Sequence, residues 1–272
     1  MANNPNNVPE HESSYIKAYE DVHLLKHDYL RPVRMELEVL KPELYLKHFN
    51  INETIVCFGS ARIAEEKQAK EKLAAAEKEL AQHPQDKALQ NKVAAAKGLL
   101  GLCKYYDEAR KFAQLVVEHT GDRFAVVTGG GPGIMEAANR GAFEKGGKSI
   151  GLNITLPHEQ RPNDYISPNM AFLFHYFAIR KIHFVMRAKA CVVFPGGFGT
   201  FDELFEILTL IQTGKKSHIP VVLVGKEFWN KVVNVEALAA YGVIAQDDTH
   251  LCPIVDTAEE AWEIVAKACD VK

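Results

Sequence analysis

Residues 194–206 read FPGGFGTFDELFE and follow directly on a short apolar run, Ala190–Phe194. The proline and three glycines end this predicted strand, and a helical pattern begins near Thr200. Glycines leave backbone N–H groups exposed, and a helix N-terminus attracts anions. Two interpretations follow: a loop that holds a monophosphate, or a tight turn whose glycines serve geometry alone. In either case the stretch predicts one strand-to-helix step of an α/β fold.

Further short β-branched runs alternate with longer helical patterns from Thr54 onward. The predicted strands are Thr54–Gly59, Arg123–Thr128, Ser149–Ile154, Ala190–Phe194 and Ile219–Val224, with Ala171–Phe174 as a weaker candidate. Such alternation predicts a mostly parallel sheet with helices on both faces. Three of the runs end in glycine turns, FGSAR, TGGGPG and FPGGFGT. The turns therefore fall at the carboxyl ends of strands, where open α/β sheets bind ligands.

The flanking segments divide the chain into three predicted parts. Residues 1–14 are polar and rich in Asn and Pro, which is typical of a flexible tail, and residues 15–50 predict short helices interrupted by Pro32 and Pro42. Residues 51–272 are predicted to form one main domain, in which the glycine turns are expected to bind a nucleotide. Within it, residues 63–98 are rich in Ala, Lys, Glu and Gln and predict an inserted helical hairpin with HPQD at its turn. This hairpin is either an arm for self-association or a solvent-facing addition.

Composition excludes several classes of protein. The net charge of −3 provides no basic field for a nucleic acid, and no apolar run approaches the roughly 20 residues that span a bilayer. The 5 cysteines form no C-x-x-C pair, which favours reduced thiols in a cytosolic protein. His175 and His183 lack partners at metal-ligand spacing, so no metal site is expected.

Glu203 lies one turn into the helix that follows the FPGGFGT turn. Its carboxylate is expected a few ångströms beyond a bound phosphate, beside the sugar. Cleavage of an N-glycosidic bond develops positive charge on the ribose, which a carboxylate stabilises, or else the carboxylate activates the attacking water. The alternative is that Glu203 only complements the helix dipole.

Several of these motifs resemble one family. The pattern P-G-G-x-G-T-x-x-E, from Pro195 to Glu203, is preceded by Arg180-Lys181, and the stretch GGGPGIMEAANRGAFEKGG covers residues 129–147. With FGSARI, they are similar to the Lonely Guy family of cytokinin-activating phosphoribohydrolases, long labelled possible lysine decarboxylases. The resemblance implies a modified Rossmann fold and hydrolysis of an adenosine-type 5′-monophosphate to free base and ribose 5-phosphate. It also implies that no metal or organic cofactor takes part and that the protein is a homodimer or larger homo-oligomer.

The resemblance also implies which residues act. Arg180 and Glu203 match the family's catalytic pair, with Arg180 stabilising charge on the leaving purine or the phosphate, because arginine keeps its proton. Arg62 is a further candidate for positioning phosphate or base. The expected substrate-binding residues are Ser60, Gly130, Gly131, Gly133, Lys181, Gly196, Gly197, Gly199 and Thr200.

Three functions remain open at this point. The first is the hydrolase, acting on AMP or on a prenylated nucleotide, since YFAIRK departs from the family's usual Met-His-Glu-Arg-Lys. The second is a pyridoxal-dependent lysine decarboxylase, which needs a lysine Schiff base. The third is a nucleotide-binding or carrier protein that uses the same loops without turnover.

Overall fold

The computed structural model describes residues 15–156 and 161–271. The flexible tail predicted for residues 1–14 lies outside these ranges. Seven strands form one sheet in the order β4-β3-β2-β1-β5-β6-β7, and every pair of neighbours is parallel. The strands are β1 (Glu53–Phe58), β2 (Phe124–Thr128), β3 (Ser149–Ile154), β4 (Ala171–Phe174), β5 (Ala188–Val193), β6 (Val221–Val224) and β7 (Ile254–Val255). The predicted parallel α/β sheet is confirmed, with the ends of the predicted strands differing by at most two residues.

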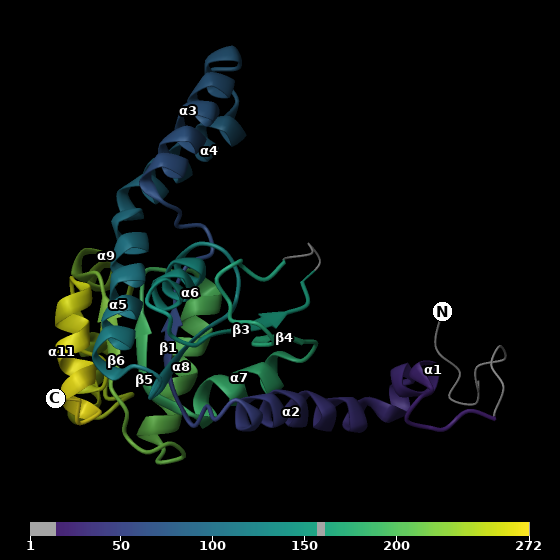
Figure 1. Cartoon of the computed structure of the whole chain (residues 1–272). Coiled ribbons are helices and arrows are strands. Elements are labelled where there is room, and N and C mark those ends of the chain that lie inside the picture. The colour runs from purple at the N-terminus through teal and green to yellow at the C-terminus, as the bar shows by residue number, and fades with distance from the viewer. Residues whose placement is uncertain (1–14, 157–160, 272) are drawn as a thin grey trace.

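Helices cover both faces of the sheet (Figure 1). One core cluster joins it to α5 (Lys104–Thr120), α6 (Ile134–Glu144) and α11 (Ala258–Ala268). The other joins it to α2 (Arg31–His48), α7 (Phe177–Met186), α8 (Phe198–Gln212) and α9 (Lys226–Val232). Successive residues of β1 alternate between the clusters, Ile55 and Cys57 to one and Val56 and Phe58 to the other. This explains the unbroken apolar runs, because strands buried on both faces have no polar side.

The remaining elements lie before α2, in the insertion, and between α9 and β7. They are α1 (Val22–Lys26), η1 (Asp28–Leu30), α3 (Glu66–Gln82), α4 (Lys87–Leu102), α10 (Val235–Ala240) and η2 (Gln246–His250). Among the described residues, no helix has the length and apolar character needed to cross a bilayer.

The predicted helical hairpin is present as α3 and α4, which stand away from the sheet (Figure 1). Its turn falls at the HPQD sequence, and Asp86 accepts hydrogen bonds from the N–H groups of Ala88 and Leu89 as the cap of α4. The second helix runs to Leu102, four residues beyond the predicted end. Ion pairs such as Lys92–Glu79 and Lys97–Glu77 join the two helices.

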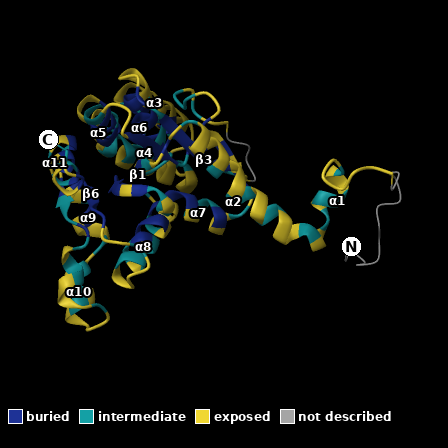
Figure 2. Ribbon diagram, turned by 60° about the horizontal axis from the view of Figure 1, so that its bottom comes forward, coloured by how far each residue is buried: buried dark blue, intermediate teal, exposed yellow. Residues whose placement is uncertain are grey.

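The prediction of short helices broken at Pro42 was wrong. Helix α2 continues through Pro42, which is buried against the core, and Pro32 occupies the first turn, where a missing N–H costs nothing. Figure 2 shows burial concentrated around the sheet, whereas α1 and the start of α2 are largely exposed. Tertiary packing of the carboxyl half of α2, which includes Leu46, therefore outweighs the hydrogen bond lost at Pro42.

Candidate active site

Loops at the carboxyl ends of β1, β2 and β5 enclose a cavity of about 260 Å³. The crossovers that follow β1 and β2 use α5 and α6 on one face, whereas α7 and α8 flank β5 on the other. The chain therefore changes direction between the neighbouring strands β1 and β5. Open α/β sheets bind ligands in the crevice at such a switch point.

The loop after β5 supplies one wall of this cavity. Gly197 is the N-cap of α8, and Gly197, Gly199 and Thr200 all line the cavity. Gly196 does not line it: a Cβ there would lie 2.1 Å from the Thr200 hydroxyl oxygen, so only glycine permits this close packing. The free N–H groups at the start of α8 thus face the cavity beside a hydroxyl, an arrangement that suits an anion.

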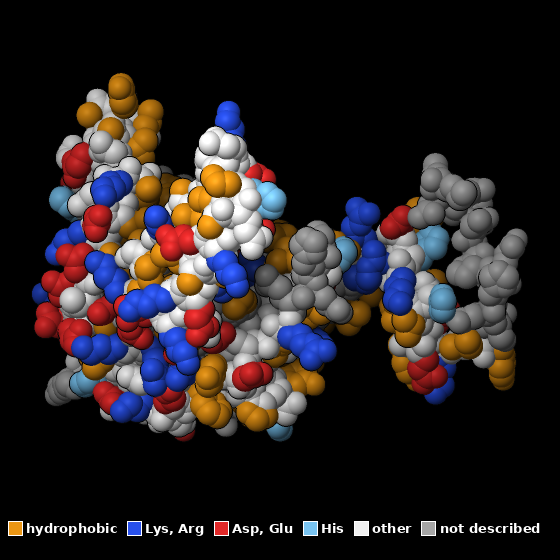
Figure 3. All heavy atoms as spheres, turned by 90° about the horizontal axis from the view of Figure 1, so that it is seen from above, with side chains coloured by type: hydrophobic (Ala, Val, Ile, Leu, Met, Phe, Trp, Pro, Cys, Tyr) orange, Lys and Arg blue, Asp and Glu red, His pale blue; other side chains and the backbone are white. Residues whose placement is uncertain are grey.

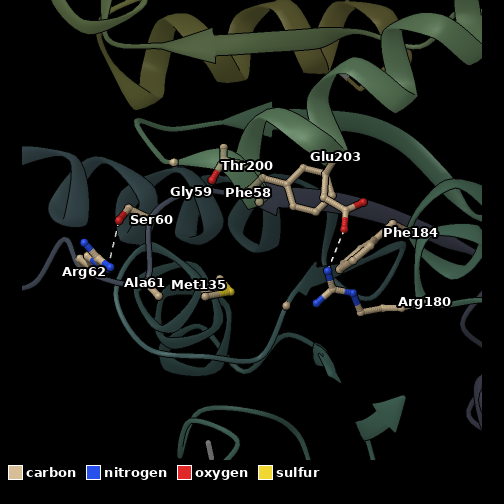
Figure 4. Close-up of a pocket in the computed structure, with 13 residues that line it drawn as sticks. Phe58, Gly59, Ser60, Ala61, Arg62, Met135, Arg180, Phe184, Thr200 and Glu203 are labelled. Carbon is tan, nitrogen blue, oxygen red and sulfur yellow. Dashed lines mark hydrogen bonds and ion pairs between the residues drawn. The ribbon is translucent and has the colours of Figure 1, made fainter. Parts of the chain in front are cut away.

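The loop after β1 supplies a second wall through Gly59, Ser60, Ala61 and Arg62 (Figure 4). The Ser60 N–H donates to the Pro195 carbonyl at 3.0 Å, which ties this loop to the one after β5. The Ser60 hydroxyl accepts from the Arg62 N–H at 3.1 Å. Ser60 therefore lies at the junction of the two loops and also contacts the cavity.

The loop after β2 contributes Gly129 and the first turn of α6 contributes Met135, but the predicted Gly130, Gly131 and Gly133 do not line the cavity. Gly133 has φ +74°, and a Cβ there would lie 2.4 Å from the Ser60 carbonyl oxygen. It therefore allows this loop to pack against the loop after β1.

A buried hydrogen-bond network that the sequence did not reveal fixes the loop after β2. Asn139 of α6 accepts from the Thr128 hydroxyl at 2.6 Å and from the Asn163 amide at 2.9 Å. Its own amide donates to the Ser149 hydroxyl at 2.8 Å. The Asn163 amide also donates to the Gly131 carbonyl at 3.0 Å. The available signal was a polar residue on the otherwise apolar, buried face of α6.

Arg180 and Glu203 meet inside the cavity, as Figure 4 shows. An Arg180 Nη atom donates to a Glu203 carboxylate oxygen at 2.9 Å, and the two side chains are 12% and 6% exposed. The guanidinium also lies over the rings of Phe177 and Phe184. Its Nε is buried and has no hydrogen-bond partner among the described residues. The arginine therefore has a donor available for a ligand.

Burial raises the pKa of Glu203 to about 7, and this effect outweighs the neighbouring positive charges of Arg180 and Lys181, which lower the pKa. A carboxyl that titrates near neutral pH exchanges protons readily at that pH. This property suits a general acid or base.

Lys181 does not line the cavity, although it was predicted to bind substrate. Its ammonium pairs with Asp202 at 2.7 Å and with Glu206 at 2.9 Å, both on α8. Lys181 thereby links α7 to α8 beside the Arg180–Glu203 pair.

The sequence analysis did not single out several of the residues that line the cavity. Phe184 follows Arg180 by one helical turn and so shares its face of α7. The lining residues not predicted individually are Phe58, Gly59, Ala61, Gly129, Met135 and Phe184.

The described residues provide neither a metal site nor a reactive thiol in the sheet. No group of three or more His, Cys, Asp or Glu side chains within residues 15–156 and 161–271 suits a metal ion. Cys57 and Cys191 lie within the sheet, where burial raises the pKa of the Cys57 thiol to about 12 and also raises that of Cys191. Both thiols are therefore inert packing groups.

Two kinds of similarity to known proteins, a family match and similarity to curated relatives, agree with the motifs. Residues 135–265 match the family described as possible lysine decarboxylase. The chain is 29% identical to the cytokinin riboside 5′-monophosphate phosphoribohydrolase LOG2 of Arabidopsis thaliana over 112 residues, which are 40% of this chain and 50% of that protein. It is 27% identical to LOG1 of the same plant over 149 residues, 53% of this chain and 67% of that protein.

The matched region covers between half and two thirds of these two relatives. Among solved structures, a molybdenum cofactor binding protein from Rippkaea orientalis aligns with a TM-score of 0.45 and 22% identity, covering 61% of this chain and 88% of that one. The family match includes the P-G-G-x-G-T-x-x-E motif and the Arg180-Lys181 pair. The match to the family model and the similarity to the named relatives, together with these motifs, support the assignment of the chain to the Lonely Guy (LOG) family, whose family description is possible lysine decarboxylase.

Proposed function

We propose that this protein hydrolyses the N-glycosidic bond of a purine nucleoside 5′-monophosphate and releases the base and ribose 5-phosphate. The buried pair of Arg180 and Glu203, set in a cavity beside the N-terminus of α8, carries this proposal. The relatives named as phosphoribohydrolases support the reaction class.

The proposed binding mode follows from the order of groups along α8. The phosphate binds the N–H groups near Gly197 and Gly199 together with the Thr200 hydroxyl. Glu203 follows Thr200 by about one helical turn, roughly 5 Å along the axis. That spacing suits a carboxylate beside the anomeric carbon of a ribose whose 5′-phosphate sits at the helix start.

In the proposed reaction Glu203 acts as a carboxylate. It accepts a proton from water as the water oxygen bonds to the anomeric carbon, and the C–N bond breaks with its electron pair passing to the base. The base takes up a proton from solvent, and Glu203 returns the proton it accepted to solvent, so the step balances. The carboxylate also stabilises positive charge on the ribose. Arg180 keeps its charge and donates hydrogen bonds to the leaving base or to the phosphate, using the unpartnered Nε.

The decarboxylase alternative does not fit the cavity. Pyridoxal chemistry needs a lysine in the site for the Schiff base, and none of the described residues that line the cavity is a lysine. Lys181, the nearest in sequence to Arg180, is paired with Asp202 and Glu206.

The test is incubation of the purified protein with AMP and with N6-isopentenyl-AMP, alongside Glu203→Ala. Chromatography then follows free base and ribose 5-phosphate. Release by the wild type alone is expected, and the two rates rank an unmodified against a prenylated adenine. Nucleotide binding without release over long incubation would instead favour the non-catalytic carrier.

A further inference from the structure

Helix α7, which carries Arg180, begins without a cap of its own. Its N-cap residue is Tyr176, whose side chain makes no capping hydrogen bond. Glu38 of α2 takes this role from outside the helix. One carboxylate oxygen accepts from the His175 N–H at 2.8 Å and the other accepts from the Tyr176 N–H at 3.2 Å. A carboxylate at this position satisfies free donors and also complements the helix dipole.

Two more contacts join α2 to α7 along the same side. The Glu38 carbonyl oxygen accepts a hydrogen bond from the His183 Nε2–H group at 3.1 Å. At the far end of α7, Arg187 forms a bidentate pair with Glu43, and its Nε donates to the Ile51 carbonyl at 3.2 Å. Helix α7 is therefore held by α2 at its start, middle and end.

This attachment bears directly on the proposed catalytic pair. Arg180 lies on the first turn of α7, only four residues beyond Tyr176, whereas Glu203 belongs to α8. The start of α7 thus sets where the guanidinium lies relative to the carboxylate. A displacement near 1 Å in such an arrangement can lower a rate a hundredfold.

We propose that Glu38, by capping α7 from the amino-terminal helix α2, is a positioning residue that holds Arg180 against Glu203. The inference rests on the proposed function, and it gives the amino-terminal helical segment a role in the reaction. The distances from Glu38 to His175 and Tyr176 carry it, together with the absence of any capping bond from Tyr176 itself.

The experiment compares Glu38→Ala and Glu38→Gln with Glu36→Ala. Glu36 is exposed on the same helix and makes no hydrogen bond or ion pair with the described residues, so it is the matched control. Glu38→Ala is expected to lower kcat at least about tenfold with KM changed less than threefold. Glu38→Gln should fall between Glu38→Ala and wild type, because its amide keeps one acceptor oxygen of two. If Glu38→Ala does not fold, the kcat of Glu38→Gln tests the inference in its place.

The pH profile separates positioning from simple loss of stability. Arg180 and Lys181 from α7 lower the pKa of Glu203, while Glu206 and Asp202 on its own helix raise it. If Arg180 moves away, the Glu203 pKa rises and the acidic limb of kcat shifts to higher pH in Glu38→Ala but not in Glu36→Ala. An unchanged limb together with unchanged kcat would overturn the inference, whatever the melting temperature does.

A measurement independent of turnover keeps this inference apart from the proposed function. The Glu203 carboxyl can be titrated by carbon-13 NMR in the wild type and in the Glu38 variants. If the wild type releases no base, the proposed function fails, yet an upward shift of the Glu203 titration in Glu38→Ala still supports the positioning role. An identical titration in both proteins would refute it.

Discussion

Replacing Glu203 by Gln should make the protein more stable at pH 8 while abolishing its activity. Burial raises the pKa of Glu203 from 4.5 to about 7, so the folded protein disfavours the ionised carboxylate. The unfavourable free energy is absent below pH 4.5 and reaches its full size above about pH 7. At 1.36 kcal/mol per pKa unit the full cost is about 3 kcal/mol. Gln resembles the protonated carboxyl and does not incur this cost.

The expected difference therefore grows with pH. From the two pKa values, Glu203→Gln should exceed wild type in free energy of unfolding by about 1 kcal/mol at pH 5 and by about 3 kcal/mol at pH 8. The assay is equilibrium urea unfolding of both proteins at pH 5, 6, 7 and 8. Because the side chain is 6% exposed, solvent screening does not reduce the difference much.

Base release by the same variant should fall by at least about a hundredfold, because an amide can neither accept the proton of water nor offset ribose charge. Two results would refute the reasoning. Unfolding curves that differ by the same amount at every pH would show that Glu203 does not titrate between pH 5 and 8. A less stable variant at pH 8 would show that the bond to Arg180 outweighs burial of the charge.

Three further outcomes follow from the geometry. Base release by the wild type should rise about tenfold per pH unit below pH 7 and level off above it, as Glu203 ionises; a fall above pH 7 would make Glu203 a general acid instead. Gly146→Ala, at φ +75° in open space, should cost about 1 kcal/mol, whereas Gly133→Ala should cost about 1–3 kcal/mol more through its clash with Ser60, as urea unfolding can check. Asn139→Ala should lower the free energy of unfolding by about 3 kcal/mol, because it leaves several buried partners unpaired; a loss below 1 kcal/mol would contradict the network.

The main strands were predictable from sequence because a sheet covered on both faces needs unbroken apolar strands. Ser149–Ile154 and Ala171–Phe174 were predicted with their observed bounds. The two-residue β7 was missed, since a strand of that length leaves no periodic pattern to detect. The surface of the main body mixes acidic and basic side chains on the face in Figure 3, as the small net charge suggested.

The break predicted at Pro42 and two features that the sequence did not reveal share one physical origin, which is tertiary contact between segments distant in sequence. Pro42 reads as a break, yet packing of α2 on the core carries the helix through it. Asn139 reads as a surface residue until its partners around β2 and β3 are known. From sequence alone Glu38 resembles any solvent-exposed acidic residue on a polar helix. Only the fold places its carboxylate at the start of α7.

The meeting of Arg180 and Glu203 follows from the topology around β5. Helix α7 leads into this strand and α8 leads out of it, both on the same face, so both helices begin at the carboxyl edge of the sheet. Arg180 lies on the first turn of α7 and Glu203 lies in the second turn of α8, which places them side by side at that edge. The N-terminus of α8 carries partial positive charge toward the cavity, whereas the start of α7 is capped by the Glu38 carboxylate. The Glu203 carboxylate, which burial disfavours, is stabilised by the positive charges of Arg180 and Lys181, and these charges limit the rise of its pKa to about 7.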